Sequence, residues 1–213
     1  KVLSRTNLDY EIIIMDNEST SVSKNLLNHL PCSRNIRVID AGINLGYGKA
    51  NNILSDLANS EVLFFLNQDT QMLSLCKNHI NYIKDLNNVS VIVPKVLNED
   101  KSTQKNIFRY PSLWSLFFEA IFIKDALLNS RSIKRLLSRE TCLDNRIVSM
   151  NRYYPSGAAF IINKNVFNNF GRFDEHIFMY HEECEMFQRL ATQIKANLVL
   201  CRDTVLMHYG GRS

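Results

Sequence analysis

Short apolar runs alternate with amphipathic stretches along the first hundred residues. Runs rich in β-branched and aromatic residues predict strands, and helical spacing of apolar positions predicts helices. The predicted strands are 10–15, 36–40, 61–66 and 89–93, and the predicted helices are 21–30, 49–58 and 73–86. We expect the last of these strands to stop at Pro94. This alternation is typical of β-α-β units and predicts an α/β fold with a mostly parallel sheet and helices on both faces.

The second half of the chain is less regular. It predicts strands at 157–163, 197–201 and 205–207 and helices at 164–170 and 182–192, with a loop at 171–180. A strongly apolar and aromatic stretch at 112–128 predicts a further helix. We find no internal repeat and therefore expect residues 1–213 to form a single domain.

Composition narrows the class of protein. Of the 213 residues, 46% are hydrophobic, which excludes wholesale disorder. No apolar run reaches the length of a membrane span, and the first residues lack the apolar core of a signal peptide. The five cysteines are widely spread without a C-x-x-C pair, which argues against a disulfide framework or a zinc knuckle. Each is interpreted as a small core residue, and a reducing, cytoplasmic setting is expected.

Positive charge is concentrated in one region. The net charge is +4, but residues 105–152 contain nine basic and four acidic residues. No nucleic-acid-binding motif accompanies this excess. The apolar and basic stretch 112–139 has two interpretations: buried core, or a helix lying on a membrane surface with its basic residues on anionic lipid.

Two short segments of the first half are candidates for binding phosphate or a metal ion. The segment Gly46-Tyr47-Gly48-Lys49 invites a phosphate-loop interpretation, but its spacing fits neither a Walker loop nor a dinucleotide fingerprint. A loop entering a helix remains the alternative. Asp69 follows a hydrophobic strand, where its carboxylate is placed either to hold a divalent cation on a diphosphate or to cap a helix.

Two further groups lie near the end of the chain. Glu182, Glu183 and Glu185 crowd a helix start, where the helix dipole favours negative charge. Crowded carboxylates also raise one another's pKa, which suits a general base. His208 ends an apolar run before a glycine-containing tail with Arg212, so it is either a packed core residue or part of an anion-facing loop.

Taken together, these motifs resemble the family-two glycosyltransferases of the GT-A (Rossmann-like) fold, in particular the bacterial rhamnosyltransferase-like branch. The resemblance runs from about residue 10 to the end, except near 105–150. It is carried by the stretches IIIMDNEST (12–20), NLGYGKANN (44–52), FFLNQDT (64–70), SGAA (156–159), GRFDEHIFMY (171–180), the helix at 182–189 and His208.

The resemblance implies roles for individual residues. Glu183 would be the catalytic general base, and Asp69 and His208 would hold Mg²⁺ or Mn²⁺. The nucleotide-sugar would be bound by Asp16, Asn17, Glu18, Asn44, Gly46, Lys49 and Asn67. The acceptor or the donor sugar would be contacted by Gly157, Asp174, Glu182, Glu185 and Arg212.

The implied activity is an inverting sugar transfer in surface polysaccharide synthesis. Rhamnose is the expected sugar, from a UDP- or dTDP-linked donor to a saccharide or lipid-linked acceptor. Residues 1–100 would bind the nucleotide-sugar, and residues 101–213 would bind the acceptor and catalyse the transfer. The expected location is the cytoplasm or the inner face of the plasma membrane, through residues 112–139.

Several features depart from the family pattern. Asn67 replaces the first acid of the family's D-x-D, and Glu183 and Glu185 replace aspartates. The usual first strand is not found before Lys1, so we expect a sheet that lacks this strand or is truncated there. These departures leave one alternative, a sugar-nucleotide-binding domain with weak or no catalysis. A nucleotidylyltransferase is disfavoured because its glycine-rich, arginine-bearing loop is missing from the start of the chain.

Overall fold

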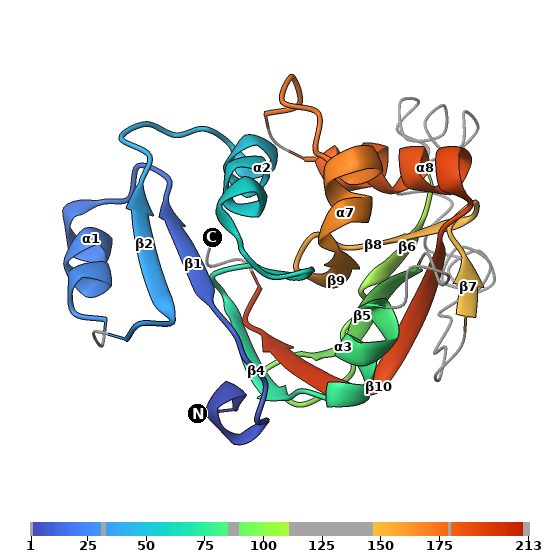
Figure 1. The fold of residues 1–213 in the computed structure, drawn as a ribbon, viewed down its shortest axis with the longest axis horizontal. Helices are drawn as coiled ribbons and strands as arrows, with labels where there is room; N and C mark the ends of the chain where they lie inside the picture. The colour runs from blue at the N-terminus through green and yellow to red at the C-terminus, as the bar shows by residue number, and fades with distance from the viewer. Residues whose placement is uncertain (1, 31–32, 85–89, 111–146, 179, 211–213) are drawn as a thin grey trace, which may run out of the picture.

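The chain folds into one large sheet, two strand pairs and a set of helices (Figure 1). The structure is a computed structural model that describes residues 2–30, 33–84, 90–110, 147–178 and 180–210. The large sheet has the strand order β3-β9-β5-β10-β4, and β7 pairs with β10. Its strands are β3 (Val62–Leu66), β4 (Thr70–Ser74), β5 (Ser90–Leu97), β7 (Ile147–Ser149), β9 (Ala159–Asn163) and β10 (Asn197–His208).

The remaining elements surround this sheet. The two separate strand pairs are β1 (Ile12–Asp16) with β2 (Ile36–Asp40), which is parallel, and β6 (Ile107–Arg109) with β8 (Tyr153–Pro155), which is antiparallel. The α-helices are α1 (Ser21–Asn28), α2 (Tyr47–Leu57), α3 (Lys77–Lys84), α7 (Lys164–Val166) and α8 (Glu182–Ile194). A 3₁₀ turn, η1 (Leu3–Arg5), and a π-helical turn, η2 (Phe167–Gly171), complete the described elements.

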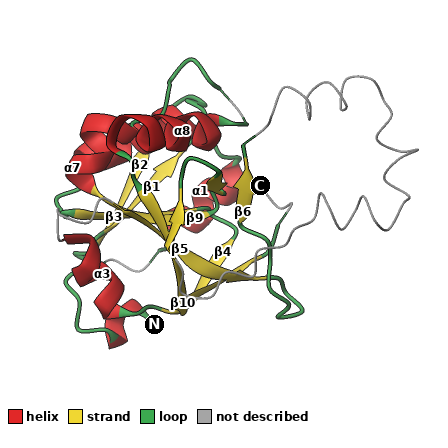
Figure 2. Ribbon diagram, turned by 90° about the vertical axis from the view of Figure 1, so that its right-hand side faces the viewer, coloured by secondary structure: helices red, strands yellow, loops and turns green. Residues whose placement is uncertain are grey.

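Helices cover both faces of the large sheet, as Figure 2 shows for α7 and α8 on one side and α3 on the other. Toward α8, Phe160 of β9 packs with Phe187 at a ring-centroid distance of 5.1 Å. Toward α3, Ile161 packs in a second cluster that contains Ile83. Successive strand residues point to opposite faces, so a strand buried on both sides is apolar throughout. The predicted α/β class and its helix layers are confirmed.

The strand directions differ from the expected, mostly parallel arrangement. Among the described strands of the large sheet, only β5 and β10 pair in parallel, whereas β9 is antiparallel to β3 and β5, and β4 and β7 are antiparallel to β10. The sheet is mixed because β9 comes from the second half of the chain and inserts between β3 and β5. A β-α-β pattern in the first half contains no signal for such an insertion.

Three element boundaries also need correction. Residues 70–74 form β4, which includes the first two residues of the helix predicted at 73–86, and α3 begins only at Lys77. Strand β5 continues through Pro94 to Leu97. The two expected strands at 197–201 and 205–207 are a single strand, β10, whose register against β5 shifts between Cys201 and Val205. The shift follows Cys201, the partner of Pro94, and proline has no N–H to donate to a continuous ladder.

The stretch 112–128, predicted as a helix, lies outside the described residues. None of the helices that the structure describes has the length and hydrophobicity that a bilayer crossing requires.

Asn52 joins α2 to the loop that precedes α8. Its side chain is 1% exposed, accepts a hydrogen bond from Phe173 N (3.0 Å) and donates one to Phe173 O (2.9 Å). It also donates to Glu175 Oε1 at 3.2 Å. A single buried amide therefore satisfies both backbone groups of Phe173, whose ring lies in the main core.

We predict that Asn52→Ala destabilises the fold, because both backbone groups of Phe173 lose their partner. Each unpaired buried group costs about 1–3 kcal/mol. Chemical denaturation followed by circular dichroism measures the loss. The matched control is Asn51→Ala, which removes one hydrogen bond to Tyr47 O inside the same helix and should cost less. Equal losses for the two variants would contradict the anchoring role of Asn52.

Candidate functional site

Asp69 and His208 meet at the edge of the large sheet where β4 begins and β10 ends. His208 pairs in register with Thr70, the residue after Asp69. The His208 Nε2 atom lies 3.1 Å from Asp69 Oδ1, and both side chains are largely buried. The backbone reinforces this contact, because Tyr209 N donates to Asp69 O at 2.9 Å. The two residues predicted to hold a metal are thus brought together, although they are 139 positions apart in the sequence.

Gln104 fixes the orientation of the His208 ring. Its Oε1 lies 2.9 Å from His208 Nδ1. A glutamine oxygen only accepts hydrogen bonds, so this contact is made by an Nδ1–H group, and the other ring nitrogen, Nε2, is the one that faces Asp69. Gln104 could not be predicted from the sequence, because it lies in an irregular segment 104 positions before His208 and no motif contains it.

Several acceptor atoms at this edge have no hydrogen-bond partner among the described residues. They are Asn67 Oδ1 and both carboxylate oxygens of Asp69, all buried. His208 Nε2 is close to Oδ1 but does not satisfy it as a hydrogen-bond donor. Buried acceptors without a donor are costly, so such atoms fit a place where a cation, a ligand or a water binds. Oxygen ligands beside one imidazole nitrogen fit Mg²⁺ or Mn²⁺.

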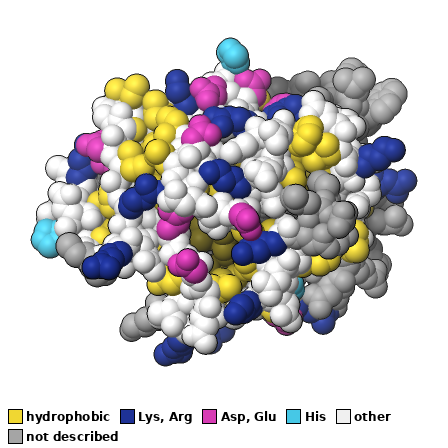
Figure 3. Space-filling model, viewed as in Figure 1, with side chains coloured by type: hydrophobic (Ala, Val, Ile, Leu, Met, Phe, Trp, Pro, Cys, Tyr) yellow, Lys and Arg dark blue, Asp and Glu magenta, His cyan; other side chains and the backbone are white. Residues whose placement is uncertain are grey.

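Space for a ligand lies next to Asp69. A pocket of about 390 Å³ is lined by Ser23, Gln68, Asp69 and Tyr209. It therefore extends from the metal-binding candidates to the first turns of α1. Figure 3 shows the face of the molecule seen in Figure 1, where acidic and basic side chains surround a hollow near the centre.

Asp16 and its neighbours form the first of the predicted nucleotide-binding loops. Asp16 is 4% exposed and accepts a hydrogen bond from Ser19 N at 2.8 Å. Hydrogen bonds from Ser19, assisted by Lys24 at 3.5 Å, lower the pKa of Asp16 below its usual value. The carboxylate of Asp16 thus already shapes the turn that leads into α1.

A second loop is held against this one by side-chain hydrogen bonds. Asn17 accepts from Leu45 N (2.7 Å) and donates to Asn44 Oδ1 (3.0 Å), and Glu18 accepts from Asn44 N (3.2 Å). Gly46 follows with φ = 78°. Three predicted nucleotide-binding residues, Asn17, Glu18 and Asn44, therefore lie together at the ends of β1 and β2.

Gly46 and Lys49 connect these loops to the segment before α8. A Cβ atom on Gly46 would lie 2.7 Å from Phe178 O, so only glycine fits there. Lys49 Nζ lies 3.8 Å from Glu175 Oε2 at the surface. The glycine that resembled part of a phosphate loop thus has a packing role in this structure.

The acidic start of α8 follows two residues with left-handed backbone. Tyr180 (φ = 65°) and His181 (φ = 69°) both occupy this region, which is unfavourable for residues with a Cβ. Glu182 comes next; it is 6% exposed, and its Oε2 has no hydrogen-bond partner among the described residues. Burial, together with the nearby charge of Glu183, raises the pKa of Glu182.

Glu183 is half-buried, and its charge acts on two tyrosines. Burial is the main cause of the raised pKa of Tyr47 and of Tyr154, and the Glu183 charge contributes to both. For Tyr154 the pKa reaches about 12. Both phenols therefore stay protonated at neutral pH.

A short backbone segment links Glu183 to the Asp69 edge. The Tyr47 hydroxyl donates to Gly157 O at 2.8 Å, and Asn67 N donates to Ala158 O at 3.0 Å. Residues 157–158 thus contact both the tyrosine beside Glu183 and the turn that carries Asp69. Gly157, one of the residues predicted to contact sugar, thus lies between Tyr47 and the turn that carries Asp69.

Other predicted sugar-contacting residues already have protein partners. Glu185 forms a two-point ion pair with Arg189, both contacts at 2.8 Å, and Arg189 also donates to Phe170 O and Arg172 O. Asp174 caps the turn at His176 through N (3.0 Å) and Nδ1 (2.8 Å). Arg212 lies outside the described residues.

The family model of Glycosyl transferase family 2 matches residues 1–192. Among curated proteins, the low-salt glycan biosynthesis hexosyltransferase Agl10 of Haloferax volcanii is 25% identical over 202 residues. This match covers 93% of the chain and 58% of Agl10, so the chain spans little more than half the length of that relative.

Two solved structures share the fold. GalNAc-T7, solved with UDP, GalNAc and Mn²⁺, superposes with a TM-score of 0.61 at 16% identity, covering 93% of this chain and 37% of the other. Residues 1–349 of S. aureus TarS superpose with a TM-score of 0.58 at 16% identity, covering 98% and 54%. At this identity the likeness shows the fold alone, and it confirms the GT-A architecture.

The raised pKa of Glu182 predicts a pH dependence of stability. A carboxyl group that binds its proton more tightly in the folded than in the unfolded state stabilises the fold at low pH. That contribution is lost as the pH rises from about 4.5, the ordinary value, through the raised pKa. Glu182→Gln should therefore stabilise the protein relative to wild type above this window and reduce the pH slope inside it.

Denaturation midpoints measured at several pH values test this prediction. The control is Glu61→Gln, at an exposed glutamate on the chain entering β3, which should leave the pH profile close to that of wild type. An unchanged profile for Glu182→Gln would show that burial does not perturb this carboxyl group.

Proposed function

Because the chain belongs to glycosyl transferase family 2, we propose that it transfers a sugar from a nucleotide-diphosphate-sugar to a hydroxyl acceptor with inversion of the anomeric configuration. The observation that carries the proposal is the buried, unpartnered set of acceptors at Asn67 and Asp69 beside His208. This set is joined through residues 157–158 to Tyr47, next to Glu183.

On the donor side, Asp69 and His208 would hold a divalent cation, which supplies positive charge to the diphosphate leaving group. Asn67 contributes a neutral oxygen, so one carboxylate provides the charge of this site. The pocket that runs from Asp69 to Ser23 supports a nucleotide placed toward the loops at 16–18 and 44–46. Those loops are rigidly paired through Asn17, which pre-orients them for binding.

On the acceptor side, Glu183 would accept the proton of the attacking hydroxyl. One displacement at the anomeric carbon forms the new glycosidic bond and breaks the bond to the diphosphate, which inverts the configuration. Glu182, directly beside Glu183, carries a raised pKa and is the runner-up for the base. The charge of Glu183 acts on Tyr47 and Tyr154, and the protonated hydroxyl of Tyr47 is already donated to Gly157 O.

The finer assignments stay proposals. Rhamnose and a UDP- or dTDP-linked donor follow from the resemblance to the rhamnosyltransferase-like branch. The acceptor is proposed to be a saccharide or a lipid-linked saccharide in surface glycan synthesis, in keeping with the glycan biosynthesis named for Agl10. Peripheral contact with the inner membrane face through residues 112–139 stays a prediction, since that segment lies outside the described residues. The division into halves 1–100 and 101–213 is likewise a proposal.

We predict that Glu183→Gln abolishes sugar transfer but leaves donor binding nearly unchanged. Loss of a general base typically lowers the rate by roughly 10²–10⁴-fold. Product formation from a nucleotide-sugar and an acceptor measures the rate, and calorimetry with UDP or dTDP measures binding. The comparison variant Glu182→Gln should keep more activity.

Two outcomes would contradict this assignment. Near-normal turnover of Glu183→Gln with an inactive Glu182→Gln would transfer the role of base to Glu182. No turnover by the wild-type chain, with intact nucleotide-sugar binding, would favour the binding-domain alternative.

We also predict that transfer requires a divalent cation and that Asp69→Ala abolishes both the activity and its metal dependence. With one carboxylate at the site, Mn²⁺ should bind weakly alone and more tightly with UDP or dTDP. Titration calorimetry in the presence and absence of nucleotide tests this. Full activity in a metal chelator would refute it, and so would tight binding of Mn²⁺ to the nucleotide-free protein that survives Asp69→Ala.

A further inference from the structure

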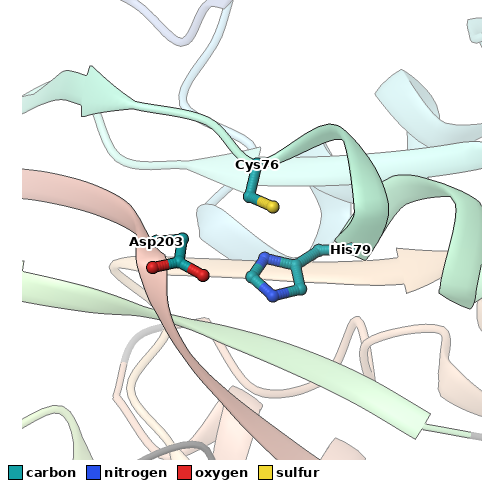
Figure 4. A group of neighbouring side chains, drawn as sticks. All are labelled: Cys76, His79 and Asp203. Atoms are coloured by element: carbon teal, nitrogen blue, oxygen red, sulfur yellow. The ribbon is translucent and has the colours of Figure 1, made fainter.

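A second group of ligand-type side chains lies away from the Asp69–His208 edge. One ligand atom from each of Cys76, His79 and Asp203 lies within 4.8 Å of the other two. Figure 4 shows the thiol, the imidazole and the carboxylate pointing toward a common space between the start of α3 and β10. Asp203 precedes His208 by five positions on β10, which corresponds to roughly 16 Å along an extended strand.

The local fold explains why these residues meet. Cys76 follows β4, and His79 lies on the first turn of α3, three positions later. Asp203 lies in the part of β10 where the register against β5 shifts, after the residue opposite Pro94. The turn that enters α3 is tied to this irregularity, because Ser74 Oγ donates to Asp203 O at 2.8 Å.

The Thr204 hydroxyl contacts two members of the cluster. Its side chain is fully buried; its hydroxyl oxygen accepts from Cys76 N at 3.1 Å and lies 3.2 Å from His79 Nδ1. A hydroxyl oxygen can accept two hydrogen bonds, so it can take one from Nδ1–H while the Nε2 lone pair stays available. An outer partner that fixes the tautomer and ring direction is typical of metal-bound histidines.

The cluster keeps a free thiol and is open to solvent. Cys76 is a free thiol. The members of the cluster are half-buried or exposed, so an ion can enter from solvent. Tetrahedral bonds of about 2.0–2.3 Å bring ligand atoms to about 3.4–3.8 Å from one another, which requires contraction of the cluster by about 1 Å.

We propose that Cys76, His79 and Asp203 form a zinc-binding site that is separate from the Asp69–His208 edge. A thiolate with an imidazole favours Zn²⁺ over Mg²⁺ or Mn²⁺, which prefer oxygen ligands. The ion would clamp the β4–α3 junction to β10. The other ends of β4 and β10 carry Asp69 and His208, so the clamp would hold the two strands that form that edge.

Cobalt and zinc titrations of the chelator-treated full chain test the proposal. Co²⁺ bound to a thiolate gives a charge-transfer absorption in the near ultraviolet, which a site made only of Asp69, Asn67 and His208 cannot produce. We expect this band in the wild type, its displacement by Zn²⁺ and its loss in Cys76→Ser. Cys201→Ala is the matched control, because it removes the neighbouring buried thiol and leaves all three ligands. A band that survives Cys76→Ser, or that disappears only in Cys201→Ala, would overturn the assignment.

Variants of His79 and of Thr204 give two further tests of Zn²⁺ binding. His79→Gln should abolish tight Zn²⁺ binding in calorimetry, whereas His29→Gln, at an exposed histidine after α1, should not. Thr204→Val should weaken Zn²⁺ binding by roughly 10–100-fold, as other outer partners do. Equal Zn²⁺ affinity in the wild type and in folded His79→Gln would contradict the site.

Thiol alkylation of the wild type avoids any loss of folding in the variants. Zn²⁺ should slow modification of Cys76 specifically, with Cys32 and Cys142 as internal controls in the same peptide map. Unchanged alkylation of Cys76 at saturating Zn²⁺ would refute the proposal, whatever the variants show.

Discussion

The candidate site depends on the antiparallel pairing of β4 with β10. This pairing places His208 opposite Thr70 and so brings its imidazole within 3.1 Å of the Asp69 carboxylate. Burying two polar side chains in this way is costly unless a partner satisfies them. The unpaired oxygens of Asn67 and Asp69 show that the described protein atoms do not complete the arrangement. A cation with a diphosphate would supply what is missing, which explains why these groups are buried together.

The acceptor side is organised by the segment that leads into α8. Asn52 binds both backbone groups of Phe173, and Gly46 allows close approach of Phe178 O. Two left-handed residues then turn the chain so that α8 begins at Glu182. Strained backbone of this kind is tolerated where the surrounding contacts hold it and where it positions functional groups. These contacts fix the position of Glu182 and Glu183 at the start of α8. Glu185, in the same turn, forms an ion pair with Arg189.

The sequence was sufficient to predict what depends on local pattern. Alternating apolar runs located most strands, and polar residues at strand ends pointed to Asp16 and Asp69. What the pattern could not predict depends on pairing between distant segments. The insertion of β9 made the sheet mixed, and Gln104 reached His208 from an irregular stretch. Cys76 was interpreted as a core residue because its neighbourhood with Asp203 depends on how β4 and β10 pair and on the register shift in β10.

The most direct test of the central claim is a double-mutant cycle for nucleotide binding in the presence of Mn²⁺. Asp69→Ala, His208→Ala and the double variant are compared with the wild type by calorimetry with UDP or dTDP. If both side chains hold the same cation, removing the second after the first should cost little, with a coupling of about 0.5–3 kcal/mol. Strictly additive losses, or no loss in either single variant, would contradict a shared site at this edge of the sheet.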